Sequence, residues 1–164
     1  MNNVRKYTDN ELLERVFNLP SFRGLPEDYW ILGVQSEEDK FNTFDDKFYL
    51  FKGGDFVLAT TGTTNAGKTA MMGYEKYNKK GVAVIKTNEW YPNLWSEEAG
   101  KVYDSIIYCN FHTNSYSLTT KLIRSLIGGW SACCQVCNNP TDYKTIIKLT
   151  KNQQYVSYCL IKEF

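Results

Sequence analysis

The sequence lacks the features that would place it at once in several large classes of protein. Charge of one sign is not in excess, because 19 Lys and Arg stand against 18 Asp and Glu. A net charge of +1 creates no field that would attract nucleic acid, so we expect no nucleic-acid partner. No run of about 18 apolar residues is present, so the sequence predicts no membrane span. The polar N-terminus also lacks the apolar segment of a secretory signal, which predicts synthesis in the cytoplasm.

Cysteine is missing from the first two thirds of the chain and is concentrated in the last third. The number of cysteines is odd, and no export signal precedes them, so we expect no disulfide framework. Reactive thiol chemistry and metal binding are then the roles to consider. The five cysteines are Cys109, Cys133, Cys134, Cys137 and Cys159.

Aromatic residues are what the sequence has in excess. They make up 15% of the 164 residues, which favours strands and surfaces that grip flat or extended ligands. Hydrophobic residues, at 43%, are sufficient for the core of one domain of this length. We therefore expect a mainly β fold of the β-rich α+β class, with two or three helices.

Helices are predicted at three places. Thr8 and Glu11 have the spacing of a capping box, and an apolar face follows them, which predicts a helix over residues 9–18. Residues 117–127 carry an apolar stripe with helical spacing, and a further helix is predicted to open at Asn139.

Strands are predicted where aromatic and β-branched residues gather between turn signals. The pair Gly53-Gly54 marks a hairpin turn between two of these strands. We expect an N-terminal helical arm over residues 1–26 and a β-rich domain over residues 27–164. The predicted strands are 29–34, 47–52, 55–61, 82–87, 105–111, 130–136 and 155–161.

The single histidine and one cysteine suggest a catalytic pair. His112 ends an apolar strand, and Cys134 lies in the next strand-like segment along the chain. A cysteine nucleophile needs a neighbouring base to form the thiolate at neutral pH, and histidine is the usual one. Ser131, three residues before the cysteine, is placed to contact the histidine or a substrate, and backbone N–H groups around Cys134 are candidates for an oxyanion hole. The alternative is that these cysteines are small buried hydrophobic residues without chemistry.

This region resembles the catalytic domain of the L,D-transpeptidases of the YkuD type. Their motif is His-Gly followed by Ser-x-Gly-Cys, and it matches His112, Ser131 and Cys134. The wider chain is similar to a group of small phage-encoded proteins, through the segments 33–36, 44–51, 60–67 and 130–136.

The resemblance implies a fold, an activity and a place of action. The fold would be an L,D-transpeptidase-like β-sandwich or barrel. The activity would be cysteine-dependent acyl transfer or hydrolysis on peptidoglycan stem peptides, with Cys134 as nucleophile, His112 as base and Ser131 as orienting group. Trp130, Thr113 and Gln135 are the expected substrate-binding residues. A phage-encoded copy made in the host cytoplasm would reach the wall through lysis or in the virion.

Three positions depart from the family motif. Thr113 replaces the glycine after the histidine, Cys133 replaces the glycine before the nucleophile, and Val136 replaces an arginine that commonly follows. A Cβ at position 133 crowds a turn that glycine normally makes. The lost arginine removes an anchor for a substrate carboxylate. A non-catalytic structural protein of a virion that keeps the fold is therefore an alternative.

A second motif predicts a different function. Residues Gly62, Gly67, Lys68 and Thr69 satisfy the P-loop pattern G-x-x-x-x-G-K-[ST] directly after an apolar strand. Such a loop binds phosphates through backbone N–H groups, with the lysine on the terminal phosphates. Against this reading, Gly73 interrupts the helix that should follow. Nucleotide binding remains an alternative.

Two further patterns are weaker. The pairs Cys109/His112 and Cys134/Cys137 have the spacing of zinc ligands. In an extended strand, however, residues three apart point to opposite faces, so we expect no metal and no cofactor. The aromatic segment 90–95 is compatible with a ligand groove and, equally, with core and strand-edge positions.

Overall fold

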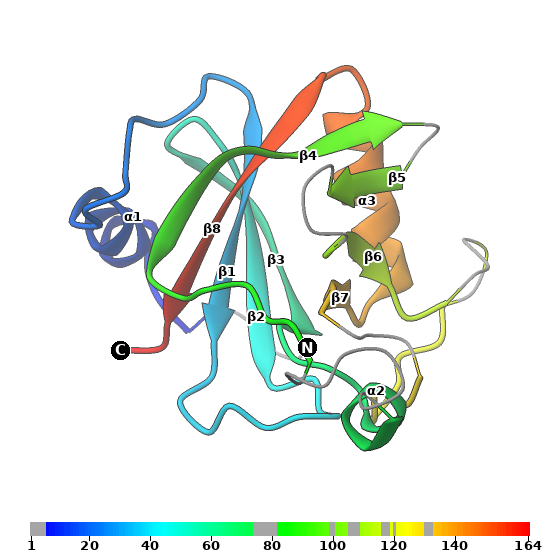
Figure 1. The fold of residues 1–164 in the computed structure, drawn as a ribbon. Coiled ribbons are helices and arrows are strands. Elements are labelled where there is room, and N and C mark those ends of the chain that lie inside the picture. The colour runs from blue at the N-terminus through cyan, green and yellow to red at the C-terminus, as the bar shows by residue number, and fades with distance from the viewer. Residues whose placement is uncertain are drawn as a thin grey trace.

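The chain folds into a closed β-barrel with three helices among the residues that the structure describes (Figure 1). The structure is a computed structural model that describes residues 6–73, 82–98, 101–104, 109–115, 119, 121–129 and 133–164. The strand order around the barrel is β1-β2-β3-β7-β6-β5-β4-β8. This confirms the expectation of a mainly β fold with two or three helices. The strands are β1 (Tyr29–Gln35), β2 (Asp46–Lys52), β3 (Asp55–Thr63), β4 (Glu89–Glu98), β5 (Lys101–Asp104), β6 (Phe111–Thr113), β7 (Gln135–Cys137) and β8 (Tyr155–Lys162). The helices are α1 (Asp9–Phe17), α2 (Lys68–Gly73) and α3 (Pro140–Thr150).

The first three strands form an antiparallel meander, and the hairpin between β2 and β3 turns at Gly53-Gly54 as predicted. Gly53 has φ +55, a left-handed conformation that glycine adopts without steric cost. The barrel closes through a parallel pairing of β1 with β8, the last strand of the chain. A second parallel pairing joins β6 to β7. The barrel therefore combines local hairpins with pairings of segments far apart in the sequence.

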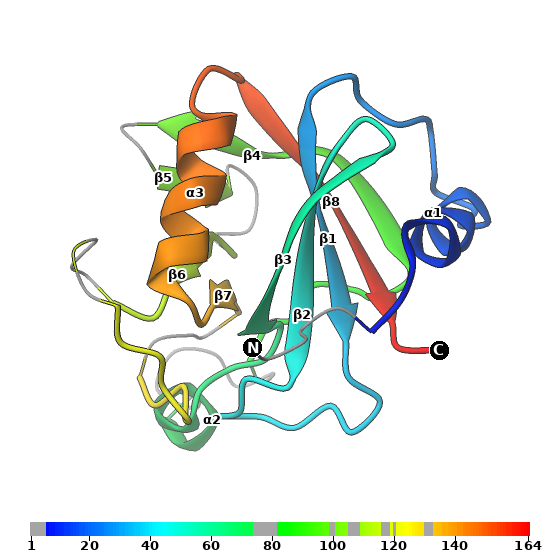
Figure 2. The ribbon, with the colours of Figure 1, turned by 180° about the vertical axis from the view of Figure 1, so that it is seen from behind.

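The barrel interior holds the larger of two hydrophobic cores. Its centre is aromatic: Trp95 packs on Tyr158 with ring centroids 4.5 Å apart, and Phe111 meets Phe48 edge to face. Helix α3 covers part of this core, because Tyr143 packs against Phe111. In Figure 2, α3 stands beside β6 and β7, on the opposite side of the barrel from α1. The capping of α3 by the Asn139 side chain confirms the helix predicted there.

A second core lies outside the barrel, under α1. Leu12 and Val16 on α1 are fully buried against the outer faces of β1, β2 and β8, where Trp30 and Cys159 lie. The predicted capping box is present. Thr8 Oγ1 accepts a hydrogen bond from the Glu11 N–H, and the Glu11 carboxylate accepts one from the Thr8 N–H. The N-terminal helix thus packs closely on the residues of the main domain.

Two predicted elements are absent from the described residues. Residues 82–87 do not form a strand, and Val84 is exposed. Of the predicted helix 117–127, the described residues 119 and 121–127 are not helical. Their backbone is held by partners distant in sequence instead: the Arg124 N–H donates to Asn138 Oδ1 at 3.0 Å. Tertiary hydrogen bonds override the local helical pattern here.

Two other predicted strands are only partly described. Of 105–111, residues 105–108 lie outside the described part, and only Phe111 is in a strand. Of 130–136, residues 130–132 lie outside it, and the strand β7 begins at Gln135. The sequence allows two roles for the aromatic segment 90–95, a ligand groove or core and strand-edge positions. In the structure the segment lies in β4, with Trp95 buried in the barrel interior and Trp90 buried in the core under α1.

Candidate active site

The parallel pairing of β6 with β7 places His112 and Cys134 on neighbouring segments. His112 is the register partner of Val136, and Cys134 lies two residues before that partner. The Gln135 N–H donates to the Asn110 carbonyl at 2.9 Å, so the ladder continues to the residues beside Cys134. For ideal parallel strands this offset places the two Cα atoms about 8 Å apart.

Burial alternates along residues 109–113, whereas in the facing segment Val136, the register partner of His112, is fully buried like Cys137 after it. Residues Cys109, Phe111 and Thr113 are buried, whereas Asn110 and His112 between them are half-buried. In the facing segment Cys133 and Gln135 are buried, and Cys134 between them is half-buried. Phe111 and Gln135, which are register partners, face the interior. Since alternate residues of a strand point to opposite faces, the register assigns His112 and Cys134 to the other face, which is covered at Val136.

The His112 ring is held in a form suited to a general base. Its Nδ1 lies 2.8 Å from the Thr113 carbonyl oxygen, so Nδ1 carries the proton and Nε2 keeps its lone pair. Burial lowers the pKa of His112 below its usual value, and the Thr113 hydrogen bond opposes this effect. The ring is therefore neutral at pH 7, with Nε2 able to accept a proton.

Cys134 is the most accessible of the thiols. Cys137 and Cys159 are buried, and burial raises the pKa of Cys137 to about 12 and that of Cys159 still further. Both thiols are therefore inert at neutral pH. Cys134 is half-buried and reduced.

Cys109 and Cys133 form a disulfide, which corrects the expectation that all five thiols are reduced. The expectation rested on the compartment and on an odd cysteine count. It had no information on the fold, which places these two residues as neighbours on adjacent strands although 24 residues separate them.

The other predicted site residues do not join this pair in the described structure. Ser131 and Trp130 lie outside the described residues. Thr113 and Gln135 point into the barrel on the opposite side from His112, and Gln135 Oε1 accepts from the Tyr158 hydroxyl at 2.6 Å. The position of these two side chains does not support the substrate contact expected of them.

Polar residues after His112 form a cluster that the sequence did not reveal. The Asn114 amide donates to the Asn138 carbonyl at 2.7 Å, and Arg124 Nε donates to the Asn114 carbonyl at 3.1 Å. Two buried oxygens, Thr113 Oγ1 and Asn114 Oδ1, have no hydrogen-bond partner among the described residues. Arg124 thus contacts the end of the strand that carries His112. The family motif has an arginine at the position of Val136, which this chain lacks. The contact is non-local, so no sequence pattern indicated it.

The P-loop pattern folds into a packed turn between β3 and α2. Four of its backbone N–H groups donate inside the protein: Thr64 to Asp46 Oδ2, Asn65 to Thr63 Oγ1, Lys68 to Asn42 Oδ1 and Thr69 to the Gly128 carbonyl. A phosphate would need these donors, and the first of them is taken by a carboxylate. Helix α2 has only six residues. The geometry therefore does not favour nucleotide binding at this loop.

The glycines of this pattern serve packing. A Cβ at Gly62 would overlap the Phe48 ring and the Val136 carbonyl, and a Cβ at Gly67 would overlap the Gly128 carbonyl. Close approach of neighbouring groups, rather than a bound phosphate, thus explains both glycines.

The zinc pattern likewise finds no support. Cys109, one of its four members, is bound to Cys133. Across the described ranges, no three His, Cys, Asp or Glu side chains gather in a way that would hold a metal ion.

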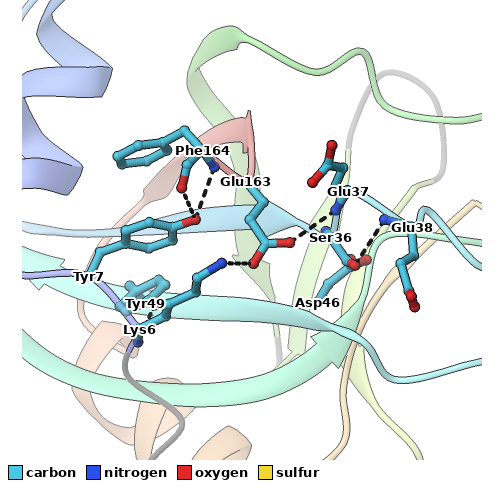
Figure 3. A network of polar contacts seen from close by, with 9 residues as sticks. All are labelled: Lys6, Tyr7, Ser36, Glu37, Glu38, Asp46, Tyr49, Glu163 and Phe164. Atoms are coloured by element: carbon cyan, nitrogen blue, oxygen red, sulfur yellow. Dashed lines mark hydrogen bonds and ion pairs between the residues drawn. The ribbon is translucent and has the colours of Figure 1, made fainter.

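A charged cleft lies where the N-terminal segment meets the end of β8 (Figure 3). Several of its groups bond to one another. Lys6 pairs with Glu163, the Glu37 N–H donates to Glu163 Oε2 at 3.1 Å, and the Tyr7 hydroxyl both donates to and accepts from the Phe164 backbone. These contacts fasten the segment before α1 to β8.

Comparison with models of known protein families, with curated proteins and with solved structures gives no match to this chain. The likeness to the L,D-transpeptidases accordingly rests on the residues of the His, Ser and Cys motif. In the described part of the chain, no helix has both the length and the apolar composition that a bilayer crossing requires.

Proposed function

We propose that this protein is an L,D-transpeptidase-like cysteine enzyme that transfers or hydrolyses acyl groups on peptidoglycan stem peptides. The observation that carries the proposal is the parallel register of β6 and β7, which brings His112 and Cys134 to one face. As part of the same proposal, the protein is phage-encoded and meets the cell wall at lysis or in the virion.

The state of His112 supports the role of base. A neutral ring with its Nδ1 proton on the Thr113 carbonyl offers Nε2 to the Cys134 thiol. Among the three free cysteines Cys134 is the one that is partly exposed, which favours it over Cys137 and Cys159 as the nucleophile.

The reaction then follows in two acyl-transfer steps. Cys134 gives its proton to His112 Nε2, and the thiolate attacks an amide carbonyl of the stem peptide. His112 returns the proton to the departing amine, which leaves an acyl-thioester on Cys134. An amine acceptor or water then attacks the thioester carbonyl and gives its proton to His112 Nε2, the C–S bond breaks, and Cys134 leaves and regains the proton. An amine acceptor gives a cross-link, whereas water gives hydrolysis. The Gln135 N–H already donates to Asn110, so the oxyanion donors must come from other N–H groups beside Cys134.

The proposal is tested by the reactivity of the thiols toward iodoacetamide as a function of pH, with labelled sites mapped by mass spectrometry. We expect selective labelling of Cys134 at about pH 6–7, below the pKa of an ordinary thiol. His112→Ala should slow this labelling about tenfold or more at pH 6.5, because the base that takes the proton of the Cys134 thiol is lost.

Cys159 is the matched internal control, since its buried thiol should label slowly in both proteins. Labelling of Cys134 that is slow and unchanged by His112→Ala would refute the enzyme proposal and favour the structural role in a virion. A positive result would be followed by release of amine from purified stem peptides, which Cys134→Ala should abolish.

A further inference from the structure

The Cys109–Cys133 disulfide joins the two segments that carry His112 and Cys134. Phe111 and Gln135 are register partners, and each cysteine lies two residues before one of them. Cys109 and Cys133 therefore stand opposite each other in the same parallel register, one position further along the interior face than Phe111 and Gln135. Their Cα atoms are 5.2 Å apart. Cys134 is the direct chain neighbour of one bonded cysteine.

The hydrogen-bonded pairing around this disulfide is short. Strands β6 and β7 have three residues each. Among the described residues, β6 is joined to β5 through the single pair Val102↔Phe111, and β7 is joined to β3 through two pairs. Long meanders such as β1-β2-β3 fix their own register, whereas two three-residue strands leave more of the alignment to the covalent bond.

We propose that the Cys109–Cys133 disulfide is a redox-dependent positioning device for the His112–Cys134 pair. In the oxidised protein the covalent bond holds the two segments in register, and the pair is aligned. In the reduced protein the alignment rests on the short strands alone, and His112 activates Cys134 less. This inference rests on the proposed function, because it assigns regulation to the same site.

The device suits an enzyme whose substrate lies outside the cytoplasm. Disulfides persist in oxidising surroundings and are reduced in the cytosol. A cell-wall enzyme with this device is weakly active where it is made and gains activity where peptidoglycan lies. The proposal also gives a reason for Cys133 at the position where the family motif has glycine, since glycine cannot form the bond.

The redox step is a thiol–disulfide exchange. With dithiothreitol, one thiolate of the reagent attacks a protein sulfur and forms a mixed disulfide, and its second thiolate then displaces that sulfur. The protein sulfurs gain two electrons and take up two protons, and the reagent leaves as its cyclic disulfide. Because Cys109 is fully buried and Cys133 is 9% exposed, the exchange requires local opening and should be slow in the folded protein.

The experiment compares oxidised and reduced protein. Thiols are counted after denaturation without reductant, and the pH profile of Cys134 labelling is measured in each state. We expect three thiols in the oxidised protein and five after dithiothreitol. On reduction, Cys134 labelling at pH 6.5 should slow about tenfold, and its pH midpoint should rise toward that of an ordinary thiol near pH 8.5. A purely structural disulfide would not move this midpoint.

The double variant Cys109→Ser/Cys133→Ser is the matched control. It should label like the reduced protein with or without dithiothreitol, and circular dichroism establishes that it is folded at the assay temperature. A second variant, Cys109→Val/Cys133→Ala, replaces it if the serines prevent folding.

The two proposals fail in different ways. Five thiols in the oxidised protein, or equal pH profiles in both redox states, would overturn the redox inference even if His112→Ala slows labelling and the enzyme proposal stands. If His112→Ala has no effect in the oxidised protein, the enzyme proposal is overturned, and with it the role of the disulfide in that reaction.

Discussion

At the scale of single residues, burial favours the neutral forms of two titratable groups. It lowers the pKa of His112, and it raises the pKa of Asp46 to about 6 although three hydrogen bonds from Ser36 and Thr64 favour the charged form. Asp46 begins β2 and accepts a hydrogen bond from the Ser36 N–H after β1 (Figure 3). It also accepts two hydrogen bonds from Thr64 after β3, so it ties these two loops together. The Asp46 carboxyl group therefore links two loops through hydrogen bonds, but ionising it in this buried position costs free energy.

The raised pKa of Asp46 predicts an unusual pH dependence of stability. The folded protein keeps the Asp46 proton between about pH 4 and 6, whereas the unfolded chain releases it. The stabilisation from this group is thus fully present below about pH 4 and is lost as the pH rises through about 6. Urea unfolding at several pH values should show the free-energy difference between wild type and Asp46→Asn shrinking by about 2–3 kcal/mol over this range.

Asp55→Asn serves as the control for this prediction, because Asp55 lies exposed in the β2–β3 hairpin. Other carboxyl groups, including Glu11 and Glu163 whose pKa values are lowered, are common to both proteins and cancel in the difference. A difference that stays constant from pH 3.5 to 7.5 would show that burial does not govern the Asp46 titration.

At the scale of elements, the turn after β3 shows how a motif can arise from packing. Gly62 lies in β3 beside Phe48, and a side chain there would enter the interior core. Gly62→Ala should lower the free energy of unfolding by about 2–3 kcal/mol through overpacking, as measured by urea denaturation. Gly73→Ala at the end of α2 is the matched control, because nothing lies within 4 Å of its Cβ position, and it should change stability by less than about 0.5 kcal/mol.

Lys68→Ala separates the packing explanation from nucleotide binding. Lys68 is exposed, so its loss should leave stability nearly unchanged. Calorimetric titration of wild type with ATP and Mg²⁺ should give no binding heat. Micromolar affinity that disappears in Lys68→Ala would restore the P-loop reading.

Elements with local signals were predictable, and those fixed by distant partners were not. The capping box at Thr8, the Gly53-Gly54 turn and the Asn139 cap each depend on residues within a few positions, and each was found. The stripe at 117–127 has equally good local spacing, but Asn138 binds the backbone of Arg124, and the described residues 119 and 121–127 are not helical. Strand β4 was missed because Pro92, followed by Asn93 at φ +53, interrupts its pairing with β8.

The candidate site was predictable only in part for the same reason. The motif proposes His112 and Cys134, and the parallel register of β6 and β7 places them on neighbouring segments. The disulfide at Cys133 and the contact of Arg124 with Asn114 depend on the closure of the barrel, which joins residues that are distant in sequence. No periodicity or spacing carries that information.

At the scale of the whole molecule, two cores share the same strands. The inner faces of β1, β2 and β8 build the barrel interior, and their outer faces build the core under α1. A helix that shared no core with the barrel could unfold while the barrel stayed folded. Helix α1 instead closes a core that contains Trp30 and Trp90, so its packing is coupled to the strands that form the barrel.

This coupling predicts that the N-terminal helix and the barrel unfold together. Leu12→Ala should leave a cavity in the outer core and lower the free energy of unfolding by about 2–5 kcal/mol. Glu14→Ala, on the exposed face of α1, should have little effect and is the matched control. In Leu12→Ala the urea transitions followed by far-UV circular dichroism and by tryptophan fluorescence should still coincide, as expected of one cooperative unit. If a helical signal is lost first while the remaining transition keeps the wild-type midpoint, residues 1–26 are an independent arm and the outer core does not stabilise the barrel.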